Sequence, residues 1–188
     1  MSQEENPMDV FTAVLTRRSA KRLVGPAPGD EEFRYLLQTA ATAPDHGVLR
    51  PWRWILVRGQ GLHTVVDGLA EEDPAVPRQQ LVDKVVRAPL KAMLVFRPRV
   101  GHRVPEWEQL AAASAMTHAL LLLLHARGYA AIWRTGRLCT SRTLPGTLGL
   151  ADGERLLGAL DIGSPDPASG PQRRRSPVDV TDHVATLV

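Results

Sequence analysis

The most basic short motif in the chain could bind a phosphate. Arg17, Arg18 and Ser19 stand together, and Lys21 follows two residues later. Two guanidinium groups beside a hydroxyl offer charge-assisted donors, and arginine can grip a phosphate with two parallel hydrogen bonds. Basic residues after a helix also commonly form a solvated last turn that favours the helix dipole. By itself this motif therefore leaves both a phosphate site and a solvated helix end open.

A second group of polar residues lies on one short loop between two prolines. Asp45 and His46 follow Pro44, and Arg50 precedes Pro51. A single histidine in a loop is usually a surface residue, and an aspartate after proline is more often a turn former than half of an acid–base pair. Together, however, the imidazole and the guanidinium are candidate ligand contacts held on one short segment.

A third group stands where an apolar strand is expected to end. Trp133, Arg134, Thr135 and Gly136 follow the apolar residues 129–132. A tryptophan there is usually a core residue, but the end of a buried strand is also a usual place for a ligand site in a layered fold. This segment is therefore a candidate binding site.

Thiol and metal chemistry find little support in the sequence. Cys139 is the only cysteine, so an internal disulfide and a thiolate metal cluster are excluded. His118 and His125 share one face of an expected helix, but no third ligand is spaced with them. We expect packed or interfacial histidines and no metal site.

Helices and strands alternate along the chain and must position these residues. A helix is expected to begin at Val10, and the pattern predicts further helices over residues 30–41, 62–69, 77–87 and 105–127. Apolar runs predict strands at residues 54–57, 92–96, 129–133 and 155–162, whereas Pro145 and Gly146 argue against a short helix after Ser141. The class is α/β or α+β, with a central sheet covered on both faces.

The long helix and the C-terminus both indicate a partner subunit. Residues 120–124 are apolar on every side of the helix, so they should be buried all round, and a chain this small could need a second subunit to supply part of the cover. The C-terminal segment, rich in proline, glycine and arginine, has no core pattern before Val178. Such a segment is better suited to reach over a neighbour than to fold on itself.

Composition sets the broad class of protein. The 188 residues, 44% hydrophobic and 23% charged, fit one soluble domain over residues 9–188 after a flexible tail at residues 1–8. The apolar stretch from Leu110 to Leu124 is short for a membrane span, and the first ten residues lack the pattern of a signal peptide. We expect a cytoplasmic protein that does not enter a membrane.

The order of the motifs resembles the nitroreductase family, and most closely its compact bacterial branch. RRSAKR comes first, APDHGVLRPW second, and GYAAIWRTG follows the long apolar helix, so that the resemblance runs from about Val10 to Pro165. It implies an α+β fold with a mixed central β-sheet flanked by helices on both faces. It also implies an intertwined homodimer with FMN at the interface between the subunits.

The resemblance assigns roles to individual residues by position. Arg17, Arg18 and Ser19 match residues that hold the phosphate and ribityl chain of the flavin, and Lys21 matches a contact to the pyrimidine edge of its ring. Two further positions, Thr42 and His46, match residues that reach the flavin from the other subunit. The last matching segment contacts the flavin a second time, and its residues are Trp133, Arg134, Thr135 and Gly136.

The implied activity is that of an FMN-dependent oxidoreductase. It would take hydride from NADH or NADPH and reduce a small-molecule acceptor, such as a nitro compound or quinone, in a ping-pong cycle. The flavin carries this chemistry, so no protein side chain is expected to be catalytic. A protein that only stores or senses FMN on the same scaffold is the alternative.

The chain departs from the family pattern in two places, and its basic residues also raise nucleic-acid binding as a possible function. The segment from Glu71 to Val86 is too short for the helical insertion that covers the flavin in larger relatives. Relatives outside the compact branch often bind the phosphate with basic residues near the C-terminus, and residues 173–175, all arginine, are either such ligands or a solvated tail. These arginines and the pI of 9.5 also raise nucleic-acid binding, but the chain has no stripe of aromatic and basic residues and no reading module, so we expect no nucleic-acid partner.

Overall fold

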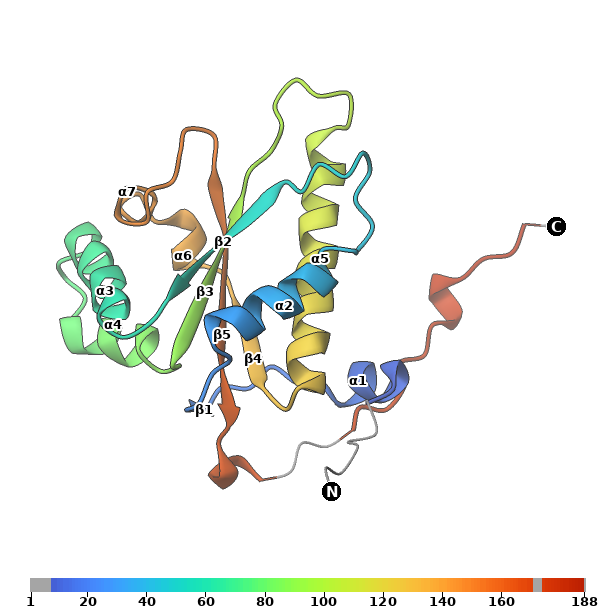
Figure 1. Cartoon of the computed structure of the whole chain (residues 1–188), viewed down its shortest axis with the longest axis horizontal. Helices are drawn as coiled ribbons and strands as arrows, with labels where there is room; N and C mark the ends of the chain where they lie inside the picture. The colour runs from blue at the N-terminus through green and yellow to red at the C-terminus, as the bar shows by residue number, and fades with distance from the viewer. Residues whose placement is uncertain (1–7, 171–173, 188) are drawn as a thin grey trace.

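A five-stranded sheet forms the centre of the protein (Figure 1). The structure is a computed structural model that describes residues 8–170 and 174–187. The strands are β1 (Leu23–Val24), β2 (Trp52–Val57), β3 (Leu90–Phe96), β4 (Ala130–Arg134) and β5 (Arg155–Pro165). They follow the order β1-β5-β3-β2, and β4 pairs with β5. All these strand pairs are antiparallel, and the parallel component is a single bridge between Ser19 and Ala131.

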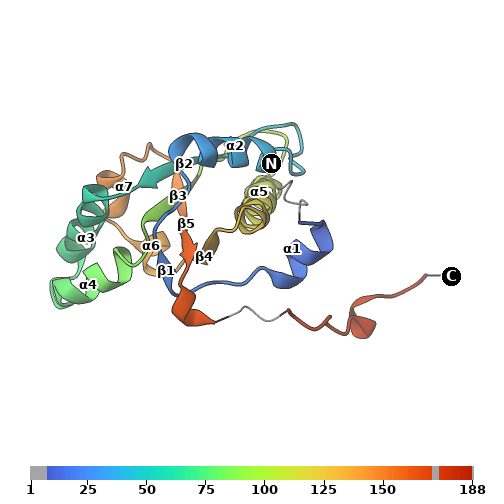
Figure 2. The ribbon, with the colours of Figure 1, turned by 60° about the horizontal axis from the view of Figure 1, so that its bottom comes forward.

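Helices cover both faces of the sheet, as the sequence predicts (Figures 1 and 2). One face carries α2 (Asp30–Ala40) and α5 (Glu106–Ala126), and the other carries α3 (Gln60–Glu72), α4 (Arg78–Val85) and α7 (Leu144–Thr147). Alternate residues of β3 serve the two cores, because successive side chains of a strand point to opposite faces. Leu90, Ala92 and Leu94 join the α2–α5 core, whereas Met93 and Val95 join the α3–α4 core.

The remaining helices lie at the ends of the sheet. α1 (Val10–Thr16) begins after Asp9, whose carboxylate accepts a hydrogen bond from the Thr12 amide at 3.0 Å, and it lies beside the C-terminal end of α5. α6 (Arg137–Thr140) follows β4, and single turns of 3-10 helix, η1 (Pro167–Ser169) and η2 (Thr181–His183), lie in the C-terminal region. The expected tail at residues 1–8 falls almost wholly outside the described residues.

α5 is the one described helix whose length and composition would allow it to cross a membrane. Core helices of soluble proteins meet the same criteria, and here α5 packs against α2 and the sheet, with Met116, Leu120 and Leu124 fully buried. Its burial is nevertheless uneven. Leu122 and Leu123 are only half-buried in the single chain. One subunit therefore does not cover residues 120–124 on every side, and the cover by a partner subunit stays a prediction.

The structure differs from the sequence predictions in the end of β5 and in the presence of helix α7 before it. β5 continues three residues beyond Ile162, because Gly163 pairs with Ala130 and the next two residues pair with β1. Pro145 does not prevent a helix, since it occupies the first turn of α7, where its missing N–H has no helical acceptor. The Ser141 hydroxyl accepts a hydrogen bond from the Leu144 amide at 3.1 Å, although the N-cap residue of α7 is Thr143.

Gly158 allows β4 to approach β5 closely. Its φ is +113°, and a Cβ placed there would lie 2.1 Å from the carbonyl oxygen of Arg134. No side chain fits at that distance. The glycine therefore fixes the position of the strand that ends in the candidate segment at residues 133–136.

A buried ion pair ties β2 to the turn before β5. Arg53 donates two hydrogen bonds to Glu154, at 2.8 and 2.6 Å, and the Glu154 side chain is only 4% exposed. These bonds lower the pKa of the Glu154 carboxyl from 4.5 to about 2. Because the charged form is favoured in the folded protein, its stabilisation is complete above pH 4.5 and is lost as the pH falls toward 2.

We expect Glu154→Gln to lower the free energy of unfolding at pH 7 by about 2 kcal/mol, a value reduced because the Arg53 side chain is partly solvated. Urea unfolding measured between pH 7 and pH 2 checks this. The difference between wild type and variant should shrink below pH 4.5. Glu31→Gln, an exposed change in α2, should leave the pH profile as it is, and an E154Q difference that stays constant down to pH 2 would contradict the assignment.

Candidate functional site

The Arg17–Lys21 segment lies against the beginning of β4. α1 ends at Thr16. The amide of the C-cap residue Arg17 donates to the Ala13 carbonyl at 3.0 Å, and the chain then becomes extended. Ser19 forms the parallel bridge to Ala131, and the Ala20 amide donates to the Ala131 carbonyl at 3.3 Å. The fold thus joins the first and third sequence motifs along one strand.

Two hollows open on either side of Arg18. One, of about 470 Å³, is lined by Arg17, Thr16, His125 and the chain around Gly128. The other, of about 500 Å³, is lined by Ser19, Lys21 and the chain from Pro165 to Gly170. Arg18 contributes to both, so the hollows adjoin at the basic motif.

The C-terminal segment adds a third cation to Arg17 and Arg18. The Arg175 amide donates to the Leu15 carbonyl at 3.0 Å, which brings this residue back to the end of α1. Burial lowers the pKa of the Arg17 guanidinium, and the charges of Arg175 and Arg18 lower it further. Arg17 remains protonated at neutral pH. Arg17 therefore lies beside two further cations, Arg18 and Arg175, and an anion bound next to Arg17 would be stabilised.

Sequence reasoning left Arg175 undecided between a phosphate ligand and a solvated tail. The sequence alone did not indicate that this arginine lies beside Arg17, because the two positions are 158 apart in the chain (175 − 17). Of the other two arginines in the 173–175 run, Arg173 lies outside the described residues and Arg174 is exposed.

His125 closes the inner side of the first hollow. Its Nε2 lies 2.7 Å from the Thr16 hydroxyl. Burial, followed by the charge of Arg17, lowers the pKa of this imidazole, so it is neutral at pH 7. It is a packed histidine, as predicted, whereas His118 is exposed on the same helix. Within residues 8–170 and 174–187, no group of three or more His, Cys, Asp or Glu side chains is placed to hold a metal.

The far end of β4 carries the other predicted segment. The Trp133 indole N–H donates to the Leu157 carbonyl at 3.0 Å, and the ring packs against the α2–α5 core. Arg134 turns to the opposite face, where its Nε donates to Asp161 at 3.3 Å and its Nη2 is buried without a hydrogen-bond partner. Thr135 and Gly136 are exposed.

A buried ion pair beneath Arg134 escaped sequence reasoning. Lys91 of β3 and Asp161 of β5 are opposite in the strand register, and their side chains form an ion pair while being 2% and 1% exposed. Burial lowers the pKa of the Lys91 ammonium, although the Asp161 charge opposes this. A lysine inside the apolar run LKAMLVF and an aspartate inside LLGALDIG were the available signals, since such residues are almost never fully buried unless paired.

Thr42 and His46 line neither of the two hollows beside Arg18 in the same subunit. The Thr42 hydroxyl donates to the Thr39 carbonyl at 2.8 Å, and His46 Nδ1 lies 2.7 Å from Glu108 Oε2. Glu108 is near the start of α5 and His125 near its end, and a helix of 21 residues is roughly 30 Å long. One subunit therefore does not bring these residues together with Arg17 and Ser19. Asp45 is the turn former predicted, since its carboxylate accepts hydrogen bonds from the amides of Leu49 and Arg50 at 3.1 and 2.7 Å.

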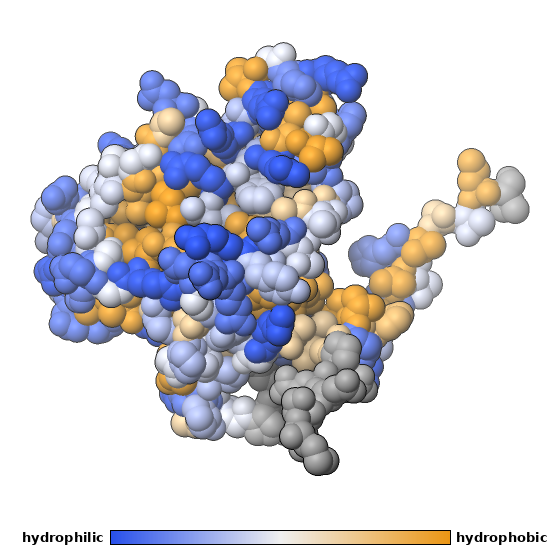
Figure 3. Space-filling model, in the orientation of Figure 1, coloured by the Kyte–Doolittle hydropathy of each residue, from blue (hydrophilic) through white to orange (hydrophobic). Residues whose placement is uncertain are grey.

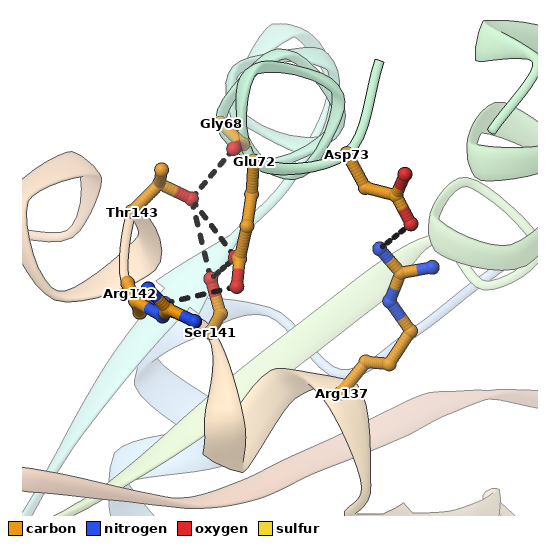
Figure 4. Close-up of polar contacts among 7 residues, drawn as sticks. All are labelled: Gly68, Glu72, Asp73, Arg137, Ser141, Arg142 and Thr143. Atoms are coloured by element: carbon orange, nitrogen blue, oxygen red, sulfur yellow. Dashed lines mark hydrogen bonds and ion pairs between the residues drawn. The ribbon is translucent and has the colours of Figure 1, made fainter. Parts of the chain in front are cut away.

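A polar cluster fixes the chain just after Gly136 to α3 (Figure 4). The Glu72 carboxylate accepts hydrogen bonds from the Ser141 and Thr143 hydroxyls, and these bonds, with that of Ser141 the strongest cause, lower its pKa. Thr143 also donates to the Gly68 carbonyl at 2.6 Å, and Arg137 Nη2 lies 3.2 Å from Asp73. The cluster anchors α6 and α7, and so holds the exposed residues 135–136 in place.

Fold and site together define a helix-covered sheet protein with a basic ligand cleft along an edge strand. The sequence model of the nitroreductase family matches residues 14–164, and the chain belongs to this family. A protein of Escherichia coli (strain K12) named "Putative NAD(P)H nitroreductase YdjA" is 30% identical over 165 residues, covering 84% of this chain and 89% of its own. A protein of Haemophilus influenzae with a name of the same kind is 29% identical over 167 residues, covering 84% of this chain and 89% of its own.

Solved structures show the same fold. The nitroreductase-like family protein from Bacillus cereus superposes with a TM-score of 0.83 at 24% identity, covering 96% of each chain. The FMN and NADPH-dependent nitroreductase NfnB from sphigopyxis sp. strain HMH gives a TM-score of 0.71 at 20% identity, covering 96% of this chain and all of the other. The predicted fold, with helices on both faces of a central sheet, is therefore confirmed.

Proposed function

We propose that this protein is an NAD(P)H-dependent flavin oxidoreductase that binds FMN along β4. The observation that carries the proposal is the bridge between Ser19 and Ala131. It places a cationic, hydroxyl-bearing motif at one end of the strand, while Arg134 with its unpartnered Nη2 stands at the other. Membership of the nitroreductase family supports the same cofactor, since the related NfnB is by name FMN and NADPH-dependent.

The residues present fit the cofactor. From Ala131 to Arg134 the strand advances about 10 Å, which a ribityl chain can bridge between a phosphate at Arg17–Ser19 and a ring near residues 133–136. The buried Arg134 Nη2 lacks an acceptor in the described chain. At Gly136, whose φ is +72°, even an added Cβ would meet no atom within 4 Å, so the backbone is open to close approach by a ligand.

The side chains of this protein bind and orient, and the flavin supplies the redox chemistry. When bound, FMN accepts hydride from NADH or NADPH and passes electrons to a second substrate such as a nitro compound or quinone. Arg17, Arg18 and Ser19 would hold the phosphate, and Lys21 would contact the ring. Arg134 provides a fixed positive charge, which favours the reduced and negatively charged flavin.

The complete site needs a second subunit. Thr42 and His46 would then approach the flavin of the partner. The surface of one subunit supports this: Phe11 of α1 is 77% exposed, and Trp107 at the start of α5 is 70% exposed. Apolar side chains also line the extended C-terminal segment (Figure 3), where Val178 and Leu187 have no cover. A homodimer in which residues 174–187 reach over the partner would bury these surfaces.

The function is tested by the colour and the reduction of the purified protein. We expect a yellow dimer that releases FMN rather than FAD on denaturation. Anaerobic stopped-flow mixing with NADH or NADPH should bleach the flavin absorbance at a rate compatible with turnover. A flavin that binds but is not bleached by either donor would support the storage or sensing alternative. A colourless monomer that cannot be reconstituted with FMN would refute both.

A further inference from the structure

A cavity of about 180 Å³ lies between α3, α4 and the far end of β4. One part of its wall is apolar and another part is positively charged. Aliphatic side chains of the helices, including Leu81 and Leu138, form one side. Five cations complete the lining, namely Lys84, Arg87, Lys91, Arg134 and Arg137.

The positive charge of this cavity is not balanced by the protein. The Asp161 carboxylate forms ion pairs with both Lys91 and Arg134, and the Asp73 carboxylate forms one with Arg137. In the part of the chain that the structure describes, Lys84 and Arg87 form no ion pair. Five cations against two carboxylates leave an excess of three positive charges around a small space.

One donor in this cluster also lacks an acceptor. Arg134 Nη2 is buried without a hydrogen-bond partner. A buried unsatisfied N–H is destabilising, but this nitrogen has almost no accessible surface. An anion in the cavity would therefore act mainly by supplying the missing negative charge. Lys91 also favours a bound anion, because the single Asp161 carboxylate is shared between the Lys91 ammonium and the Arg134 guanidinium.

The volume of the cavity and its apolar wall favour one class of anion over others. A cavity of about 150 Å³ accommodates a benzene ring, so this one has room for a single ring. An inorganic ion would leave the aliphatic wall without contacts. A small aromatic carboxylate instead places its ring against Leu81 and Leu138 and its oxygens toward the cations.

The cavity adjoins the segment proposed to contact the flavin, because Thr135 is among its lining residues. We propose that it binds the carboxylate of an aromatic electron acceptor, so that the protein prefers acceptors such as nitrobenzoates over their neutral analogues. This inference rests on the proposed function, since it requires a flavin beside Thr135. It assigns Lys84 and Arg87 as residues that determine acceptor specificity.

The experiment compares 4-nitrobenzoate with 4-nitrobenzamide, which differ mainly in charge. Binding to the oxidised, FMN-saturated protein is measured by isothermal titration calorimetry, which needs no turnover. We expect the carboxylate to bind at least about tenfold more tightly, the factor that one charge-assisted hydrogen bond contributes. The double change Lys84→Met and Arg87→Met should remove this preference. Arg78→Met, on the same helix but outside the cavity, is the matched control and should keep it.

The possible outcomes test the acceptor specificity of the cavity separately from the proposed flavin chemistry. Equal binding of the two compounds, or a preference that survives in the double variant, would overturn the specificity assignment while the flavin chemistry stands. A carboxylate that binds only to FMN-free protein and competes with FMN would also overturn it, because the cavity would then belong to the cofactor. A preference lost in the double variant and retained in Arg78→Met supports it.

Discussion

Replacing both Arg17 and Ser19 by alanine is expected to raise the dissociation constant of FMN by at least about a hundredfold. Each residue would contribute hydrogen bonds to a charged phosphate, worth about 1.5–3 kcal/mol apiece, and about 1.4 kcal/mol corresponds to a factor of ten. Arg17 is partly buried beside Arg18 and Arg175, so water replaces its charge poorly. Fluorescence titration of FMN-free protein measures the change.

Riboflavin provides the sharpest control for this prediction, because it lacks only the phosphate. The double variant should bind riboflavin as wild type does, and Arg34→Ala, an exposed change on α2, should leave FMN affinity unaltered. Equal losses for FMN and riboflavin would place the phosphate elsewhere. The residues would then act on the fold or on another part of the cofactor.

Asp161→Asn is expected to lower the free energy of unfolding by about 3–5 kcal/mol. Removing one partner of a buried ion pair leaves an uncompensated charge, and here two cations depend on the same carboxylate. Asparagine preserves the shape of the side chain, so the loss reports charge rather than packing. Urea unfolding of the wild type and the variant at pH 7 measures it.

A double variant tests the role of charge in this ion pair. Replacing Lys91 by methionine together with Asp161 by leucine removes both charges of the pair, and such replacements are often neutral or stabilising, although Arg134 still loses its carboxylate. The double variant should therefore be more stable than Asp161→Asn. A loss below about 1 kcal/mol in Asp161→Asn would show that Lys91 and Arg134 are adequately solvated without the carboxylate.

The sequence by itself determined the longer elements and their order, but not β1, α6 and α7. The α2 stripe of Phe33, Leu36 and Ala40 indicated a helix packed on one face, and the apolar run at residues 92–96 indicated a strand covered on both faces. The motif at residues 17–19 and the segment at 133–136 were also visible, because clustered arginine, serine and tryptophan stand out against apolar surroundings. Periodicity and composition are local properties, so a single chain reports them directly.

The tertiary structure alone decided which of these residues meet. Strand register put Lys91 opposite Asp161, and the return of the C-terminal segment brought Arg175 to Leu15. The length of α5 separated His46 from Ser19 within one subunit. The sequence pattern could not set these distances, because they depend on how elements far apart along the chain pack together, and the burial of apolar surface that drives packing is not directional.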